Sequence, residues 1–141
     1  MILDLNALFS NAQAITADAA STNVIDLGAP GVIPYGNIQL QRNFGIKEIP
    51  LLIQVVEDFA TLTSLTVHVQ CDTSDAFGSP KNLISHTVAV AELVAGYIFP
   101  IDKLPRSIDE RYIRLYFDVA GSNATAGKIT AGIVGAVDMK K

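Results

Sequence analysis

One short stretch of the sequence, HVQCDTSDAF at residues 68–77, combines residue types that could perform chemistry. It contains a histidine, the single cysteine of the chain and two aspartates, the groups that a metal site or a cysteine nucleophile requires. The alternation of the residues before it places Cys71 on an apolar face with Val67, whereas His68 points to the opposite face. A nucleophile and its base must approach to about 3 Å, which strand neighbours on opposite faces cannot do. We therefore predict that Cys71 is a buried, unreactive residue and that residues 72–75 form a turn.

The two histidines of the chain are not expected to meet at a metal ion. A hairpin between residues 65–71 and 84–90 would direct His86 to the apolar face and His68 away from it. A jelly-roll metal site needs more converging ligands than this pair supplies. We predict no metal ligands and no cofactor.

The adjacent carboxylates Glu57-Asp58 and Asp109-Glu110 stand where strands are expected to end. A glycosidase needs two carboxyl groups that face each other across roughly 5–10 Å, and adjacency in sequence does not supply that geometry. Both pairs are therefore predicted to lie in solvated turns. No glycine-rich loop leads from a strand into a helix, so phosphate binding has no support. We predict no catalytic residues and a protein that is not an enzyme.

The composition is that of one globular domain spanning residues 1–141. Half of the residues are hydrophobic and 17% are charged, which argues against disorder. The net charge of −4 and the scattered lysines and arginines argue against a nucleic-acid partner. The start of the chain lacks a basic segment typical of a signal peptide, and apolar runs such as PLLIQVV are too short for a membrane span. We expect a soluble protein that acts where it is made and binds no membrane.

The elements that must position these groups are β-strands, because period-2 alternation dominates the chain. The expected strands are PLLIQVV (50–56), LTVHVQC (65–71), ISHTVAV (84–90), YIFPID (97–102), RYIRLYFDV (111–119) and KITAGIVGAV (128–137). Glycine and proline clusters separate them, including one at residues 120–127. Short strands at hairpin spacing predict an all-β fold, an antiparallel jelly-roll-like β-sandwich or barrel.

Two segments depart from the alternating pattern. Leu5, Leu8, Phe9 and Ala12 recur at helical spacing, so residues 1–12 are predicted to form a short N-terminal arm or helix. Residues 28–49 are predicted to form a long irregular loop, a kind of segment that is usually functional or disordered.

A protein interface is the function that the residue types support best. Tyr112, Arg114 and Tyr116 share the outward face of one strand, and tyrosine and arginine are enriched at interface hot spots. A half-exposed sheet face is the alternative, since aromatic residues are also favoured there. The apolar residues near the N-terminus could pack back on the domain or dock on a partner. The candidate interface residues are Leu3, Leu5, Leu8, Phe9, Tyr35, Arg42, Lys47, Tyr112, Arg114 and Tyr116.

Five segments, in this order, carry a resemblance to a known family: MILDLNALFSNAQAITADAASTNVIDLG (1–28), VQCDTSDAFGSPKNL (69–83), ELVAGYIFPI (92–101), RYIRLYFDVAG (111–121) and ATAGKITAGIVGAV (124–137). Together they resemble the capsid cement (decoration) proteins of short-tailed bacteriophages, the Bordetella-phage type. The loop at 29–49 departs from the family by its greater length. The resemblance implies a jelly-roll-like domain that dimerises, binds the outer surface of a phage capsid and has no catalytic residues. It also implies that residues 1–28 form an arm and first strand and that residues 111–114 begin a strand.

The expected function is therefore that of a structural virion protein, assembled in the host bacterial cytoplasm and located on the outer capsid surface. Its expected partners are the major capsid protein and a second copy of itself, with no nucleic acid. The alternative is a carbohydrate- or receptor-binding β-sandwich of the virion, although the chain has no tryptophan and four tyrosines to offer as platforms for sugars.

Overall fold

A computed structural model of the protein describes residues 3–29, 32–33, 38–39, 48–106 and 108–135. Its elements are β1 (Leu3–Ala14), β2 (Ala19–Ala20), β3 (Ile25–Asp26), β4 (Val32–Ile33), β5 (Ile38–Gln39), β6 (Leu51–Asp72), β7 (Lys81–Ala89), the 3-10 helix η1 (Val90–Glu92) and β8 (Tyr112–Val134). All strand pairs are antiparallel. None of the described residues belongs to a helix with the length and apolar character that crossing a membrane requires.

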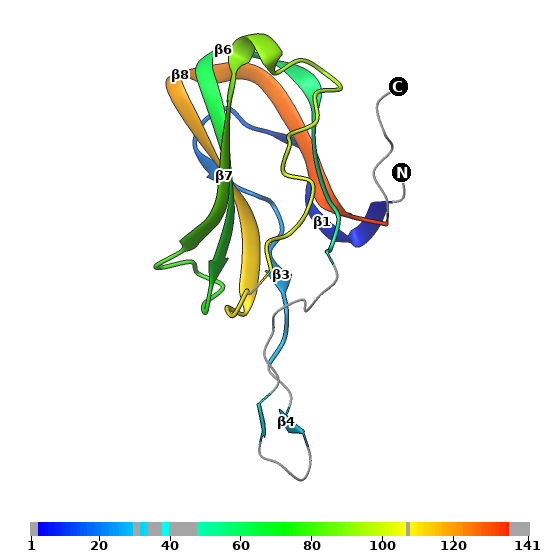
Figure 1. Ribbon diagram of the computed structural model, residues 1–141. Helices are drawn as coiled ribbons and strands as arrows, with labels where there is room; N and C mark the ends of the chain where they lie inside the picture. The colour runs from blue at the N-terminus through cyan, green and yellow to red at the C-terminus, as the bar shows by residue number, and fades with distance from the viewer. Residues whose placement is uncertain (1–2, 30–31, 34–37, 40–47, 107, 136–141) are drawn as a thin grey trace.

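Two long, bent strands, β6 and β8, form the frame of the fold (Figure 1). They pair along most of their length, from Leu51 opposite Ile133 to Asp72 opposite Tyr112. Both bend midway, so each contributes one half to each of two layers. We call the layer with residues 64–72 and 112–120 layer A, and the layer with residues 51–57 and 128–134 layer B.

The remaining strands extend these two layers. β7 pairs with the layer A half of β6, and β2 and β3 pair with the layer A half of β8. β1 pairs with the layer B half of β8. On the other edge of layer B, Gln54 forms an isolated bridge with Ile98 and Pro50 forms one with Lys103. The result is the predicted all-β antiparallel sandwich, whereas the strand order does not confirm the jelly-roll detail of the prediction.

The bend has identifiable backbone causes. The register between β6 and β8 shifts four times between Val55 and Ser64, which marks β-bulges. On β8, Gly127 has a φ of +135°, a conformation that residues with a side chain rarely adopt. On β6, Thr61 has a φ of +75°, and its hydroxyl donates to the carbonyl oxygen of Asn123 at 2.7 Å. The bulges therefore bend both strands from one layer into the other while β6 and β8 remain paired.

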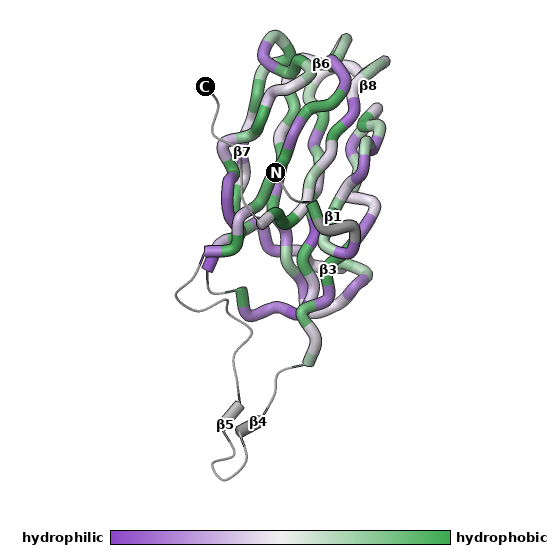
Figure 2. The backbone as a smooth tube through the Cα atoms, turned by 90° about the vertical axis from the view of Figure 1, so that its right-hand side faces the viewer, coloured by the Kyte–Doolittle hydropathy of each residue, from purple (hydrophilic) through white to green (hydrophobic). Residues whose placement is uncertain are grey.

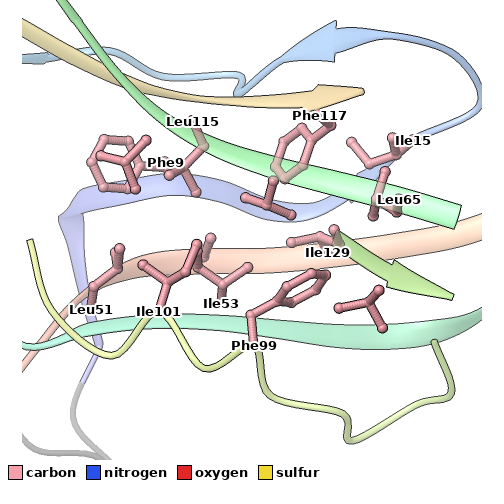
Figure 3. Packing of buried hydrophobic residues seen from close by; sticks show 14 of the residues in the cluster. Phe9, Ile15, Leu51, Ile53, Leu65, Phe99, Ile101, Leu115, Phe117 and Ile129 are labelled. Atoms are coloured by element: carbon pink, nitrogen blue, oxygen red, sulfur yellow. The ribbon is translucent and has the colours of Figure 1, made fainter. Parts of the chain in front are cut away.

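The core fills the space between the layers (Figure 3). Alternation decides its members, since Leu65, Val67 and Val69 of layer A are fully buried, as are Ile53 and Val55 of layer B. Other fully buried side chains come from β1, the residue that follows it, β8 and the segment after η1, namely Phe9, Ile15, Phe99, Ile113, Leu115, Phe117 and Ile129. Figure 2 shows hydrophilic and hydrophobic positions alternating along the strands of both layers.

The helix alternative predicted for the N-terminal segment is wrong, because β1 begins at Leu3 and pairs with β8, in line with the first strand that the resemblance implies. The helical spacing of its apolar residues arises from bulges. Register shifts fall between Leu3 and Leu8, between Leu8 and Ser10 and between Ser10 and Gln13. Each bulge inserts a residue and so breaks the period of two. Leu8 and its neighbour Phe9 are consequently both buried, at 6% and 0% exposure.

Two further boundaries differ from prediction. Residues 120–127 were predicted as a turn between strands and instead lie inside β8, because they remain paired with the bulged part of β6. Within the predicted loop at 28–49, the described residues of β4 and β5 pair as a two-stranded sheet. Figure 1 shows this small sheet away from the sandwich.

Candidate functional site

The outer face of layer A carries a regular array of polar side chains. Its central column comes from β6, and the strand registers place each member between one residue of β7 and one of β8. The three rows are Thr87–Thr66–Asp118, Ser85–His68–Tyr116 and Asn82–Gln70–Arg114. We call these nine residues the polar grid. Side chains of one strand face share a direction, so the grid lies opposite the buried core residues of the same strands.

Hydrogen bonds join the columns of the polar grid. The hydroxyl groups of Thr66 and Thr87 lie 2.8 Å apart. His68 Nδ1 lies 2.7 Å from Ser85 Oγ, and His68 Nε2 lies 3.9 Å from a carboxylate oxygen of Asp118. Throughout the described residues, every buried side-chain nitrogen and oxygen has a hydrogen-bond partner. The grid is thus a pre-ordered surface.

One corner of the polar grid combines a cation with two aromatic rings. Gln70 donates from Nε2 to Asn82 at 2.8 Å and accepts from Arg114 Nε at 2.9 Å. The guanidinium carbon of Arg114 lies 4.0 Å from the ring centroid of Phe77 and 5.5 Å from that of Tyr116. Phe77 reaches this face because residues 73–80 form the turn between β6 and β7. Arginine held against aromatic rings is typical of interface hot spots.

Cys71, the candidate nucleophile of residues 68–77, is buried as predicted. Cys71 is 1% exposed and lies in the core cluster. Burial, followed by the nearby carboxylate of Glu110, raises the pKa of its thiol, so little of it is the reactive thiolate. The predicted directions of the histidines are confirmed, because His86 is opposite Val67 and its ring contacts that of Phe99, whereas His68 belongs to the polar grid. In the described part of the chain, no three potential ligand side chains converge to hold a metal ion.

A pocket of about 250 Å³ lies beside the turn after β6 and is lined by Asp72, Thr73, Ser79, Lys81 and Glu110. Both carboxylates that line the pocket already form an ion pair or hydrogen bonds within the protein. Glu110 is paired with Lys81, and Asp72 binds backbone amides of the turn. The predicted solvated turn is wrong for Glu110, which is 9% exposed, because the Lys81 ammonium compensates its burial. Glu57 and Asp58 also differ from prediction, since they lie within β6 where it bends.

The hydrogen bonds of the Asp72 carboxylate lead us to expect that the protein loses stability at low pH. Its carboxylate accepts the N–H groups of Ser74 and Ser79 at 3.1 and 3.0 Å, and these bonds hold its pKa below the usual value near 3.8. Because the folded pKa is depressed, this stabilisation is complete above the unfolded pKa and is lost as the pH falls through the folded pKa. The free energy of unfolding, measured with urea, should therefore fall more steeply below about pH 4 for wild type than for Asp72→Asn. Parallel decline of the two proteins would contradict a structural role for the Asp72 charge.

The structure brings together some of the predicted interface residues. Tyr112, Arg114 and Tyr116 are half-buried on the outer face of layer A, as predicted. Leu8 and Phe9 pack back on the domain, so the alternative of docking on a partner is wrong for them. Leu3, at the start of β1, is 39% exposed. The side chain of Leu5 and the whole of Tyr35, Arg42 and Lys47 lie outside the described residues.

Sequence reasoning missed most of the polar grid, although signals for it were present. The outward direction of His68 was predicted, and a hairpin between residues 65–71 and 84–90 was considered as a condition for the directions of the two histidines. The missing step was the register of β6 against β8, which places Gln70 opposite Arg114. Register between strands far apart in sequence is decided by the bulges in the bend, which the sequence pattern does not reveal.

Comparison with known protein families identifies the family to which the chain belongs. A search of curated proteins found no match. The family model described as Bbp16 matches residues 9–133, a span that runs from the core residue Phe9 of β1 almost to the end of β8. The name of the family suggests a Bordetella phage protein. The chain belongs to the Bbp16 family.

Proposed function

We propose that this chain is a structural, non-enzymatic virion protein, a cement (decoration) protein that binds the outer surface of a phage shell. It bridges neighbouring capsomers and resists their separation when packaged DNA presses on the shell. The observation that carries the proposal is the polar grid. It offers an arginine that Gln70 holds by a hydrogen bond beside the ring of Tyr116, so little conformational entropy of this arginine remains to be lost on binding. Membership in a family whose name suggests a phage protein supports it.

The partners in this proposal are the major capsid protein and a second copy of the chain. A closed two-fold dimer is the commonest homo-oligomer. A dimer that grips two shell sites gains roughly 10²–10⁴ in avidity without new contacts, so each contact can be modest. Sedimentation equilibrium at tens of micromolar should show the dimer, and a monomer there would restrict dimerisation to the capsid.

The test of the proposal compares undecorated and fully decorated particles of the phage that encodes the chain. Both are heated side by side while DNA release is followed. Decoration is expected to raise the release temperature, because each bound subunit must detach before the capsomers that it bridges can part. An unchanged release temperature at full decoration would refute the cement function. Binding on a glycan array would then support the carbohydrate- or receptor-binding alternative.

A further inference from the structure

Arg114 differs from the other described cations in its pairing. Six of the ten lysines and arginines lie in the described part of the chain. Five of them have a carboxylate within salt-bridge distance: Lys81 with Glu110, Lys103 and Arg106 with Glu48, Arg111 with Asp26, and Lys128 with Glu57. Arg114 has no such carboxylate among the described residues. Asp72 influences this guanidinium only as a charge outside salt-bridge distance, so no described carboxylate neutralises Arg114 by direct contact.

The guanidinium of Arg114 is nevertheless held in place. Its Nε donates to Gln70, whose own amide is fixed by Asn82, and the rings of Phe77 and Tyr116 lie close to it. No hydrogen bond joins its two terminal nitrogens to another described residue. An arginine held in this way can donate hydrogen bonds from its two terminal nitrogens to both oxygens of a planar anion such as a carboxylate.

Because Arg114 is partly buried, its lack of a contacting carboxylate among the described residues costs free energy. Arg114 is half-buried, and burial lowers the pKa of its guanidinium because the site withholds solvent from the charge. An arriving carboxylate would replace that solvation, and the neighbouring rings would exclude water from the new pair. Such charge pairs are stronger than exposed ones when their hydrogen bonds are well aligned.

We infer that Arg114 binds a single carboxylate of the phage shell protein, through its two terminal nitrogens, when the polar grid docks on the shell. This inference rests on the proposed cement function. The grid favours one carboxylate over a polyanion such as nucleic acid, because the carboxylates of Asp118 and Asp72 lie on strands β8 and β6 of the same layer and would repel repeated negative charge.

The test measures binding of labelled protein to undecorated shells for wild type and three variants. Arg114→Gln is expected to weaken binding by about 30-fold or more, since it leaves the shell carboxylate buried without its partner. Arg114→Lys keeps the charge but loses the two parallel N–H donors of the guanidinium, so binding is expected to weaken about tenfold. Arg106→Gln changes the net charge equally at an exposed position already paired with Glu48, and its binding should stay within about twofold of wild type.

A second arm uses shells whose carboxylates have been converted to amides by ammonia in the presence of a carbodiimide. Wild type should bind these shells as weakly as Arg114→Gln binds native ones, and Arg114→Gln should be unaffected by the treatment. Equal binding of wild type and a folded Arg114→Gln to native shells would overturn the inference and leave the cement function standing. Absence of wild-type binding would refute the cement function itself. If Arg114→Gln fails to fold, Arg114→Lys on native and amidated shells gives the same comparison.

Discussion

Replacing Phe9 with alanine is expected to lower the free energy of unfolding by about 3–5 kcal/mol, the usual cost of removing a buried phenylalanine. Phe9 has no exposed surface and belongs to the same core cluster as Leu115 and Phe117 (Figure 3). It also stands on β1, which is held to the sandwich mainly by its pairing with β8. Urea unfolding followed by circular dichroism would measure the change.

Leu3→Ala is the control for Phe9→Ala, because Leu3 lies on the same strand and is 39% exposed. It should cost less than about 1 kcal/mol. Comparable effects of the two substitutions would mean that β1 behaves as an arm rather than as a strand of the sandwich. Phe9→Ala would also show that a truncation reaching residue 9 cannot separate binding from folding, since it removes a core side chain.

Replacing Gly127 with alanine is the second change with a large expected effect, a loss of about 2–6 kcal/mol in the free energy of unfolding. Two causes contribute. The φ of +135° strains any residue with a side chain, and a Cβ atom would lie 2.2 Å from Cδ1 of the Phe59 ring. Phe59 is itself 6% exposed, so its ring has little room to withdraw. The substitution therefore tests whether this glycine allows β8 to bend.

Gly78→Ala is the matched control, since an added Cβ there meets no atom within 4 Å. Its effect on stability should be within about 1 kcal/mol of wild type. If Gly127→Ala proved equally mild, the bend would have to accommodate a side chain by moving Phe59, and the assignment of the bend to this glycine would be wrong.

The core was predictable where strands are regular, as in residues 65–71 and 111–119. Their alternation identified Val67 and Cys71 as inward residues and Arg114 as an outward one, because the period of two is a local property of extended backbone. The same rule failed in β1. Bulges there add residues out of phase, and the resulting spacing of Leu8 and Phe9 imitates a helix.

The site was predictable only in part for a related reason. The sequence indicates that Tyr112, Arg114 and Tyr116 share a face, and it supplies the aromatic and cationic groups of an interface. It does not indicate that Phe77, in a turn 37 positions before Arg114, lies beneath the guanidinium. That contact depends on how the turn after β6 folds over the outer face of layer A.

By itself, the sequence determined the all-β class, the burial of Cys71 and the outward direction of the tyrosines and arginine on β8. These features follow from local alternation and from turn residues. The tertiary structure alone decided that residues 51–72 and 112–134 are single bent strands, that β1 joins the sandwich, and that Arg114 meets Gln70 and Phe77 without a carboxylate among the described residues. The physical reason is that bulges and register between distant strands depend on how both layers close over one core, a constraint that no local segment carries.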